Sequence, residues 1–177
     1  MEEVILTTMK IPKAAVPQMA GEMLHSLLQH RDIETDNPNE VRMDLEAVMT
    51  QYIRDEQAIT ESARELVNRR GLPSSQIGRT KRQLAEQQKL KLGEDGIDYL
   101  VEQMIESLMH SHNVGEIYAA DHRLRRKLRE PLRRALDSES NMHGQVRQRM
   151  KHMKEGSASW EIEYQRILED VRRRKGM

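Results

Sequence analysis

The chain has 177 residues, with 29 Lys and Arg against 29 Asp and Glu, and it contains no cysteine. The absence of cysteine excludes disulfides, thiol catalysis and cysteine-based metal sites. The length allows one domain or two small ones, and an aromatic content of 3% disfavours a β-sandwich or barrel. The balanced total conceals an asymmetry, because acids are in excess in residues 1–77 and bases in residues 78–177.

Apolar residues recur at every third or fourth position through most of the chain, a spacing typical of amphipathic helices. In the first half the predicted helices cover residues 16–28, 38–53 and 57–70. Asn37 and Pro38 supply an N-cap amide and a proline at the first helical position, and Gly71 ends the third helix. The segment 76–92 is far more polar, so we expect it either to bridge two halves or to become ordered on a partner.

The helical pattern then begins again, with the most regular apolar stripe of the chain over residues 97–109. In the second half the predicted helices cover residues 97–109, 115–137, 142–153 and 160–175. Pro131 lies inside the second of them and is expected to bend or break it, because proline cannot donate the i to i−4 hydrogen bond. A turn is expected over residues 156–159.

Two successive sets of helices predict an all-α protein built as a tandem pair of small helical bundles, with about four helices each. Val16 and Met19 align with Val101 and Met104, which gives a period of about 85 residues. We expect an N-terminal helical repeat over residues 1–75, a polar bridging helix or linker over 76–96, and a C-terminal helical repeat over 97–177. The alternative is that amphipathic helices resemble one another for generic reasons.

Two stretches carry more information than periodicity alone. The first, EIYAADHRLRRKLREPL, covers residues 116–132, and the second, EGSASWEIEYQR, covers 155–166 and is followed by a basic run at 172–175. With the Gly-Leu-Pro turn at Gly71 they resemble the bacterial domain-of-unknown-function family 507, which is all-helical, over nearly the whole chain. Residues 1–9 look like an extension beyond the usual family start. The resemblance implies a small helical bacterial protein and supplies no activity, cofactor or catalytic residue.

Metal and catalytic sites have little support in the sequence. Glu22 and His25 have the Glu-x-x-His spacing of di-iron bundles, but such a site needs a second pair, which the sequence lacks. His110 and His112, two positions apart, cannot share a helix face, so we interpret them as polar residues at a helix end and its following loop. We expect no metal, no cofactor and no catalytic residue, and therefore no enzyme.

The most informative feature is a dense basic run in the second half. It comprises Arg123, Arg125, Arg126, Lys127, Arg129, Arg133 and Arg134. Leu124, Leu128 and Leu132 are predicted to face the core, so the charges spread over the rest of the helix surface. These seven residues are the candidate partner-binding surface. The alternatives are that they stay solvated, or that they pair with the acidic surface of residues 32–65 and unite the two halves.

We therefore expect a non-enzymatic cytoplasmic helical binding or adaptor protein, with a basic interaction face on the C-terminal repeat and an acidic protein surface as its partner. The alternative is an RNA- or DNA-associated protein that contacts the phosphate backbone without sequence readout, because no aromatic residue interleaves the run. No apolar run is long enough to span a membrane, and Glu2 and Glu3 stand where a signal peptide requires positive charge. These features favour the cytoplasm.

Overall fold

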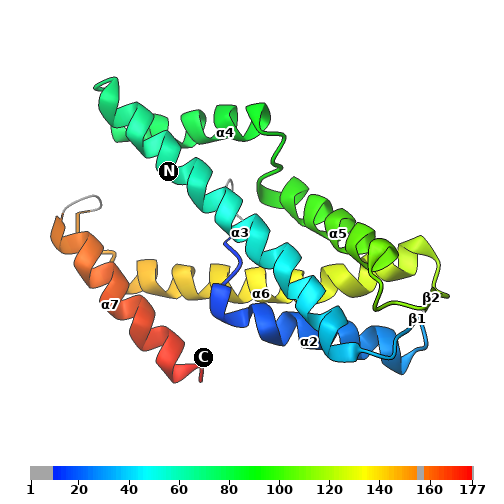
Figure 1. Cartoon of the computed structure of the whole chain (residues 1–177). Helices are drawn as coiled ribbons and strands as arrows, with labels where there is room; N and C mark the ends of the chain where they lie inside the picture. The colour runs from blue at the N-terminus through cyan, green and yellow to red at the C-terminus, as the bar shows by residue number, and fades with distance from the viewer. Residues whose placement is uncertain (1–9, 155–157, 177) are drawn as a thin grey trace. The chain divides into compact units, whose positions relative to one another are not determined.

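The computed structural model describes residues 10–154 and 158–176, and these residues are mainly helical (Figure 1). The predicted all-α class is confirmed. The chain divides into two compact units, the first ending at Ala135 and the second beginning at Leu136, and helix α6 contributes to both. Across the described helices, none combines enough length with enough apolar character to cross a lipid bilayer.

The first unit consists of helices joined by short turns and a small sheet. Its elements are η1 (Lys13–Ala15), α2 (Val16–Gln29), β1 (Ile33–Glu34), α3 (Pro38–Arg69), η2 (Ser74–Gln76), α4 (Ile77–Gln87), α5 (Gly93–His110), β2 (Glu116–Ile117) and the first half of α6 (Asp121–Arg149). The strands pair antiparallel, with Ile33 opposite Ile117 and Glu34 opposite Glu116. This pairing holds the loop after α2 beside the loop after α5.

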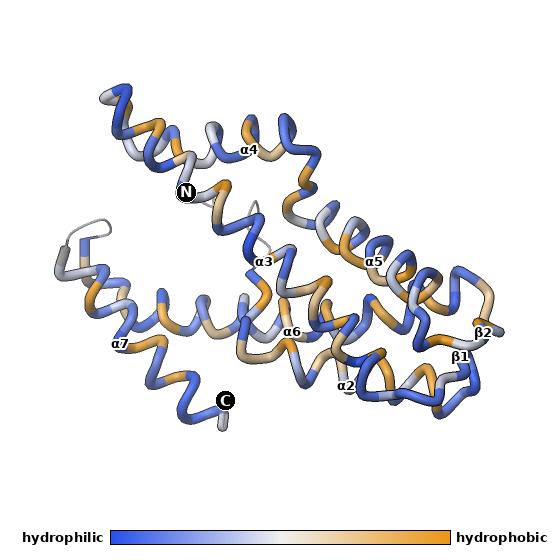
Figure 2. The backbone as a smooth tube through the Cα atoms, viewed as in Figure 1, coloured by the Kyte–Doolittle hydropathy of each residue, from blue (hydrophilic) through white to orange (hydrophobic). Residues whose placement is uncertain are grey.

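The core of the first unit is formed by the predicted apolar stripes. Its fully buried side chains include Met23, Leu27, Leu45, Met49, Ile59, Leu100, Met104, Leu108, Leu128 and Leu132. In Figure 2 the hydrophobic residues are more frequent along α2 and α5 than along α4 and α6. The predicted stripe of α5 is buried from Ile97 to Leu108, but Met109 is 67% exposed because the last turn of α5 presents it to solvent.

The predicted helices 38–53 and 57–70 form one continuous helix, α3. The separation was wrong because the polar residues between them contain no helix breaker. Glu56 is even buried there, and its carboxylate pairs with Lys81 of α4. The stop at Gly71 is confirmed: its φ of 61° lies in the left-handed region, where glycine has no Cβ to strain the backbone.

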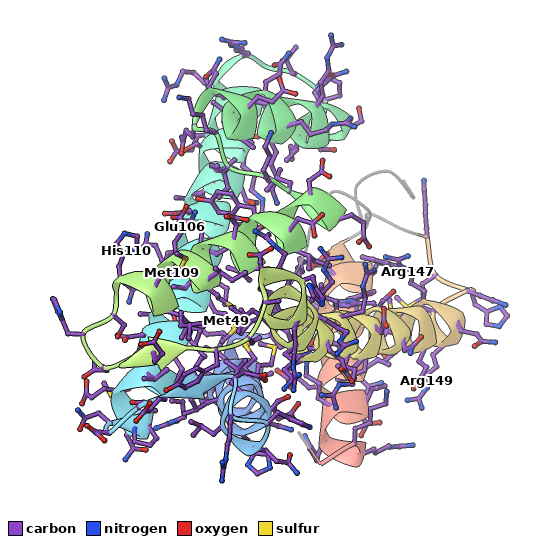
Figure 3. All side chains as sticks on the ribbon, turned by 90° about the vertical axis from the view of Figure 1, so that its right-hand side faces the viewer. Met49, Glu106, Met109, His110, Arg147 and Arg149 are labelled. Atoms are coloured by element: carbon purple, nitrogen blue, oxygen red, sulfur yellow. The ribbon has the colours of Figure 1, made fainter. Side chains whose placement is uncertain are left out.

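The polar segment 76–92 contains α4, which packs along the second half of α3. Lys81 and Ala85, one turn apart, form its buried face. We call residues 56–91 the α3–α4 hairpin. In Figures 1 and 3, α4 and the last turns of α3 extend away from α2, β1 and β2. At the base of the hairpin, the Tyr52 hydroxyl donates a hydrogen bond of 2.9 Å to the Lys91 carbonyl.

Helix α6 is continuous, so the predicted helices 115–137 and 142–153 are one element and Pro131 does not break it. Pro131 is buried. Burial of its ring on the apolar face of α6 offsets the hydrogen bond that it cannot donate to the carbonyl of Lys127. Residues 116 and 117, predicted as helix, form β2 because their backbone pairs with β1.

The second unit is the second half of α6 packed against α7 (Ala158–Arg174). Its core consists of Met142, Val146, Met150, Tyr164, Leu168 and Val171. Trp160, the single tryptophan of the chain, packs against this cluster together with Ile167. Of the turn predicted at 156–159, residues 156 and 157 lie outside the described residues, and Ala158 and Ser159 are the first residues of α7.

The order helix, strand, long helix, helix occurs twice, as α2-β1-α3-α4 and as α5-β2-α6-α7. The paired residues Ile33 and Ile117 are about 84 positions apart, close to the predicted period. The compact units do not follow this order, because α5, β2 and the first half of α6 belong to the first unit. The boundary after Ala135 thus differs from the predicted boundaries at 75 and 97.

The buried ion pair of the hairpin gives a first prediction. The side chains of Glu56 and Lys81 are 11% and 6% exposed. Glu56→Leu leaves the Lys81 ammonium buried without its carboxylate and should lower the free energy of unfolding by about 3 kcal/mol. Glu56→Leu combined with Lys81→Met should recover most of this loss, as measured by urea unfolding followed by circular dichroism. A double variant no more stable than the single one would contradict the assignment.

Candidate functional site

The predicted basic run lies on the first half of α6. Leu124, Leu128 and Leu132 are buried as predicted, and the spacing of four residues between them aligns them on one face of the helix. The seven Arg and Lys side chains therefore leave α6 on its other faces. Their surroundings decide whether they are available to a partner.

Two of the seven side chains converge on one buried carboxylate. Asp32, which follows α2 and is 2% exposed, forms ion pairs with Lys127 and with Arg123, whose Nε lies 2.9 Å from Oδ1. The Arg123 contact is an ion pair without hydrogen-bond geometry. Lys127 also donates a hydrogen bond of 3.0 Å to the Ser26 carbonyl. The Asp32 carbonyl in turn accepts hydrogen bonds from the amides of Tyr118 and Ala119.

Three further arginines form a ladder with α5, which we call the α5–α6 ladder. Its ion pairs are Arg125–Glu102 at 2.6 Å, Arg129–Asp98, and Arg133–Glu94, in which two guanidinium nitrogens each lie 2.8 Å from a carboxylate oxygen. From one ion pair to the next, the residue number of the arginine rises by four and that of the acid falls by four. One side chain per turn from each of two antiparallel helices therefore meets its partner.

The last members of the run differ from each other. Arg134 pairs with Glu22 of α2 at 2.9 Å. Arg126 is exposed and takes part in no ion pair within the part of the chain that the structure describes. The predicted run thus faces acids of α2, α5 and the loop before β1. Of these acids, Asp32 alone belongs to the acidic region 32–65 that the sequence offered as an internal partner.

A second set of cations lies on the α3–α4 hairpin. Residues 69–91 contain seven Lys and Arg and a single acid, Glu86. Lys81 is paired with Glu56, and Arg82 is engaged within the chain. The other five, Arg69, Arg70, Arg79, Lys89 and Lys91, are exposed, and none of them forms an ion pair with another residue of 10–154 or 158–176.

The sequence analysis missed this second surface. The density of positive charge is lower in residues 69–91 than in residues 123–134, so only the denser run was predicted as a binding surface. The excess of seven bases over one acid is visible in the sequence, but residues 123–134 have the same ratio, with Glu130 as their one acid. The ratio therefore marks both runs, and only the tertiary structure shows which bases meet a carboxylate.

A shallow hollow of about 150 Å³ opens between α3 and α5. Its lining residues are Val48, Gln51, Tyr52, Asp55, Tyr99, Leu100 and Gln103. Burial, followed by the nearby Glu56 and Tyr99, raises the pKa of Tyr52, so its hydroxyl stays protonated and donates to the Lys91 carbonyl. The hollow is smaller than the roughly 300–1,000 Å³ that encloses a typical small ligand.

The histidines expected at a helix end are found there. His110 is the last residue of α5, and its Nδ1 lies 2.8 Å from the Glu106 carbonyl oxygen. Figure 3 shows both residues on α5 together with Met109. Within the described ranges, no group of three or more His, Asp or Glu side chains is arranged to hold a metal ion.

The second unit contains a buried polar cluster between α6 and α7. Glu139 is 5% exposed, accepts hydrogen bonds of 3.2 and 3.3 Å from Arg172, and lies 3.4 Å from His143, whose other ring nitrogen contacts the Tyr164 hydroxyl. Burial acts to raise the pKa of Glu139, but His143 and Arg172 together outweigh it and hold that pKa below 4.5. The carboxylate is therefore charged at neutral pH and fixes α7 on α6.

These surfaces define a small helical protein in which most cations of one set are paired internally, while five exposed cations of another set have no ion-pair partner among the described residues. Residues 9–177 match the model of the family described as a protein of unknown function, DUF507, and the chain belongs to this family. The resemblance found in the sequence is thereby confirmed. Comparison with curated proteins gives no match.

Asp32 provides a prediction that separates buried from exposed charge. Asp32→Asn leaves Arg123 and Lys127 without their carboxylate and should lower the free energy of unfolding by about 3 kcal/mol. The matched control is Glu94→Gln, which breaks an exposed pair and should cost at most about 1 kcal/mol. Urea unfolding measures both variants, and equal losses would show that Asp32 has no special role.

Glu139 provides a prediction on pH. Because folding lowers its pKa, Glu139 stabilises the second unit above its ordinary pKa of 4.5, and this contribution is lost as the pH falls below that value. Glu139→Gln should therefore destabilise the unit by about 1.5 kcal/mol at neutral pH, and the difference from wild type should shrink in acid. Trp160 fluorescence reports unfolding of this unit. A difference that stays constant down to acidic pH would refute the assignment.

Proposed function

We propose that this protein is a non-enzymatic helical binding protein that holds an acidic macromolecule on the α3–α4 hairpin. The observation that supports the proposal is the contrast between two cationic surfaces. On α6 most of the basic side chains already have carboxylate partners, whereas on the hairpin five exposed ones have no ion-pair partner among the described residues. Unneutralised charge is what steers and orients an acidic partner.

The α6 run stays a second predicted surface. A partner that bound there would have to replace internal carboxylates by its own. Exposed ion pairs are worth about 0–1 kcal/mol each, so the exchange at the α5–α6 ladder would cost little. Arg126 needs no such exchange, and it is therefore the residue of the run that best reports binding there.

An adaptor role in the bacterial cytoplasm is part of the same proposal, with an acidic protein as the first partner class and nucleic acid as the alternative. The repeated element order supports a further part of it, that the chain arose as a tandem pair of helical bundles by duplication. The two compact units, each with its own apolar core, support the adaptor role because each provides a separate surface.

The proposal is tested by affinity purification of the full chain from its native host, with and without nuclease. The hairpin variant carries Arg69→Gln, Arg70→Gln and Arg79→Gln, and it should lose most of the captured partner. The matched body variant carries Lys10→Gln, Lys13→Gln and Arg31→Gln, exposed cations of the same unit, and should retain it. Each variant removes three positive charges, so a change in total charge affects both equally.

The α6 surface is tested in the same purification by Arg126→Glu. The broader reversal of Arg125, Arg126, Arg129 and Arg133 to Glu would place new acids beside Glu94, Asp98 and Glu102. Like charges would then face each other along the α5–α6 ladder, so helical circular dichroism must accompany that variant. Capture of the same partner by wild type, hairpin variant and Arg126→Glu alike would remove the proposal.

A further inference from the structure

The chemistry of the α3–α4 hairpin identifies the class of acidic partner that fits it. An acidic protein and a nucleic acid both attract Lys and Arg, so charge alone does not separate them. The other side chains of the hairpin separate the two classes. Protein interfaces favour apolar side chains around the cations, whereas phosphate backbones favour hydrogen-bond donors.

The exposed surface of the hairpin is polar rather than apolar. The core of a protein–protein interface is rich in aromatic and aliphatic side chains. Within the hairpin, the one exposed large hydrophobic residue among those that the structure describes is Leu72, at 43%. This composition disfavours a protein partner.

Amide and hydroxyl side chains lie between the cations instead. The exposed ones are Ser74, Ser75, Gln83, Gln87 and Gln88. Such groups, together with Lys and Arg, make most of the hydrogen bonds to phosphate and sugar oxygens in protein–DNA complexes. On α4, Arg79 and Gln83 are one turn apart, on the side opposite to the buried Lys81 and Ala85. The face turned away from α3 thus presents these donors, with Glu86, three residues after Gln83, as the one acid of α4.

The form of nucleic acid follows from two further features. Residues 56–91 contain no Phe, Tyr, Trp or His, so they provide no aromatic ring on which an unpaired base could stack. Helix α4 is about 16 Å long, and a duplex presents about one phosphate charge per 1.7 Å of its axis, so roughly nine phosphates lie within its reach. A double helix supplies this charge density without requiring stacking.

We infer that the α3–α4 hairpin binds the phosphate backbone of a nucleic-acid duplex through Arg69, Arg70, Arg79, Lys89 and Lys91, without sequence readout. The inference rests on the proposed function and specifies its partner.

The test is fluorescence anisotropy with the purified full chain and labelled duplexes of about 20 base pairs, two unrelated sequences each of RNA and DNA. Equal affinity for the two sequences is expected. If each of the five cations meets one phosphate, affinity falls about 500-fold between about 50 and 200 mM salt. Comparing the RNA and DNA duplexes shows which of the two phosphate backbones the hairpin binds more tightly.

The variants defined above sharpen the test. The hairpin variant should lose about 100-fold in affinity near 0.1 M salt, and the slope of log K against log salt should fall by about 2.7. The body variant should bind like wild type and keep the full slope. Circular dichroism of the hairpin variant should match wild type, because the replaced side chains are exposed and form no ion pair with the described residues.

Equal losses in the hairpin and body variants, or no duplex binding by wild type, would overturn the inference. Tighter binding of poly-L-glutamate than of duplex would do the same and would indicate an acidic polypeptide. In each of these cases the proposed function survives if capture of a host partner still depends on the hairpin. The proposed function fails if the hairpin variant captures the host partner as well as wild type does, whatever the duplex measurements show.

Discussion

Asp32 is the residue on which the arrangement of the first unit depends. Its buried side chain takes the charges of Arg123 and Lys127 from α6, while its backbone carbonyl accepts the amides of Tyr118 and Ala119 that follow β2. Asp32 alone thus contacts both the segment after β2 and helix α6, which come some ninety residues later in the chain. Because a buried carboxylate is costly without partners, moving α6 away from Asp32 would leave an uncompensated buried charge.

With α6 fixed in this way, the other charges of the first unit separate into two groups. The α5–α6 ladder neutralises arginines that the sequence suggested for a partner, and it does so because two antiparallel helices offer opposite charges once per turn. On the hairpin, Arg69, Arg70, Arg79, Lys89 and Lys91 form no ion pair with any described residue. This difference supports the functional proposal.

The second unit pairs part of its positive charge internally. The second half of α6 and α7 hold a position in the element order comparable to α3 and α4, yet Arg172 pairs with Glu139, and Arg149 and Arg174 pair with Asp170. The pairing is partial, because Lys151, Arg173 and Lys175 are exposed and form no ion pair with the described residues. If the two hairpins descend from one ancestor, their charges have diverged while the helices were retained.

The sequence by itself determined the helical class and most buried apolar positions, because the return of apolar residues every three or four places is a local property. It also identified the family, through the stretches at 116–132 and 155–166. The continuity of α3 could have been predicted, since no helix breaker separates its halves. That of α6 could not, because the buried Pro131 is stabilised by neighbours that a local pattern does not contain. The availability of each cation was likewise decided by tertiary structure alone. The sequence shows which residues are charged, but a basic side chain is neutralised only by a carboxylate within a few ångströms. Only folding brings Glu94, Asp98 and Glu102 alongside α6.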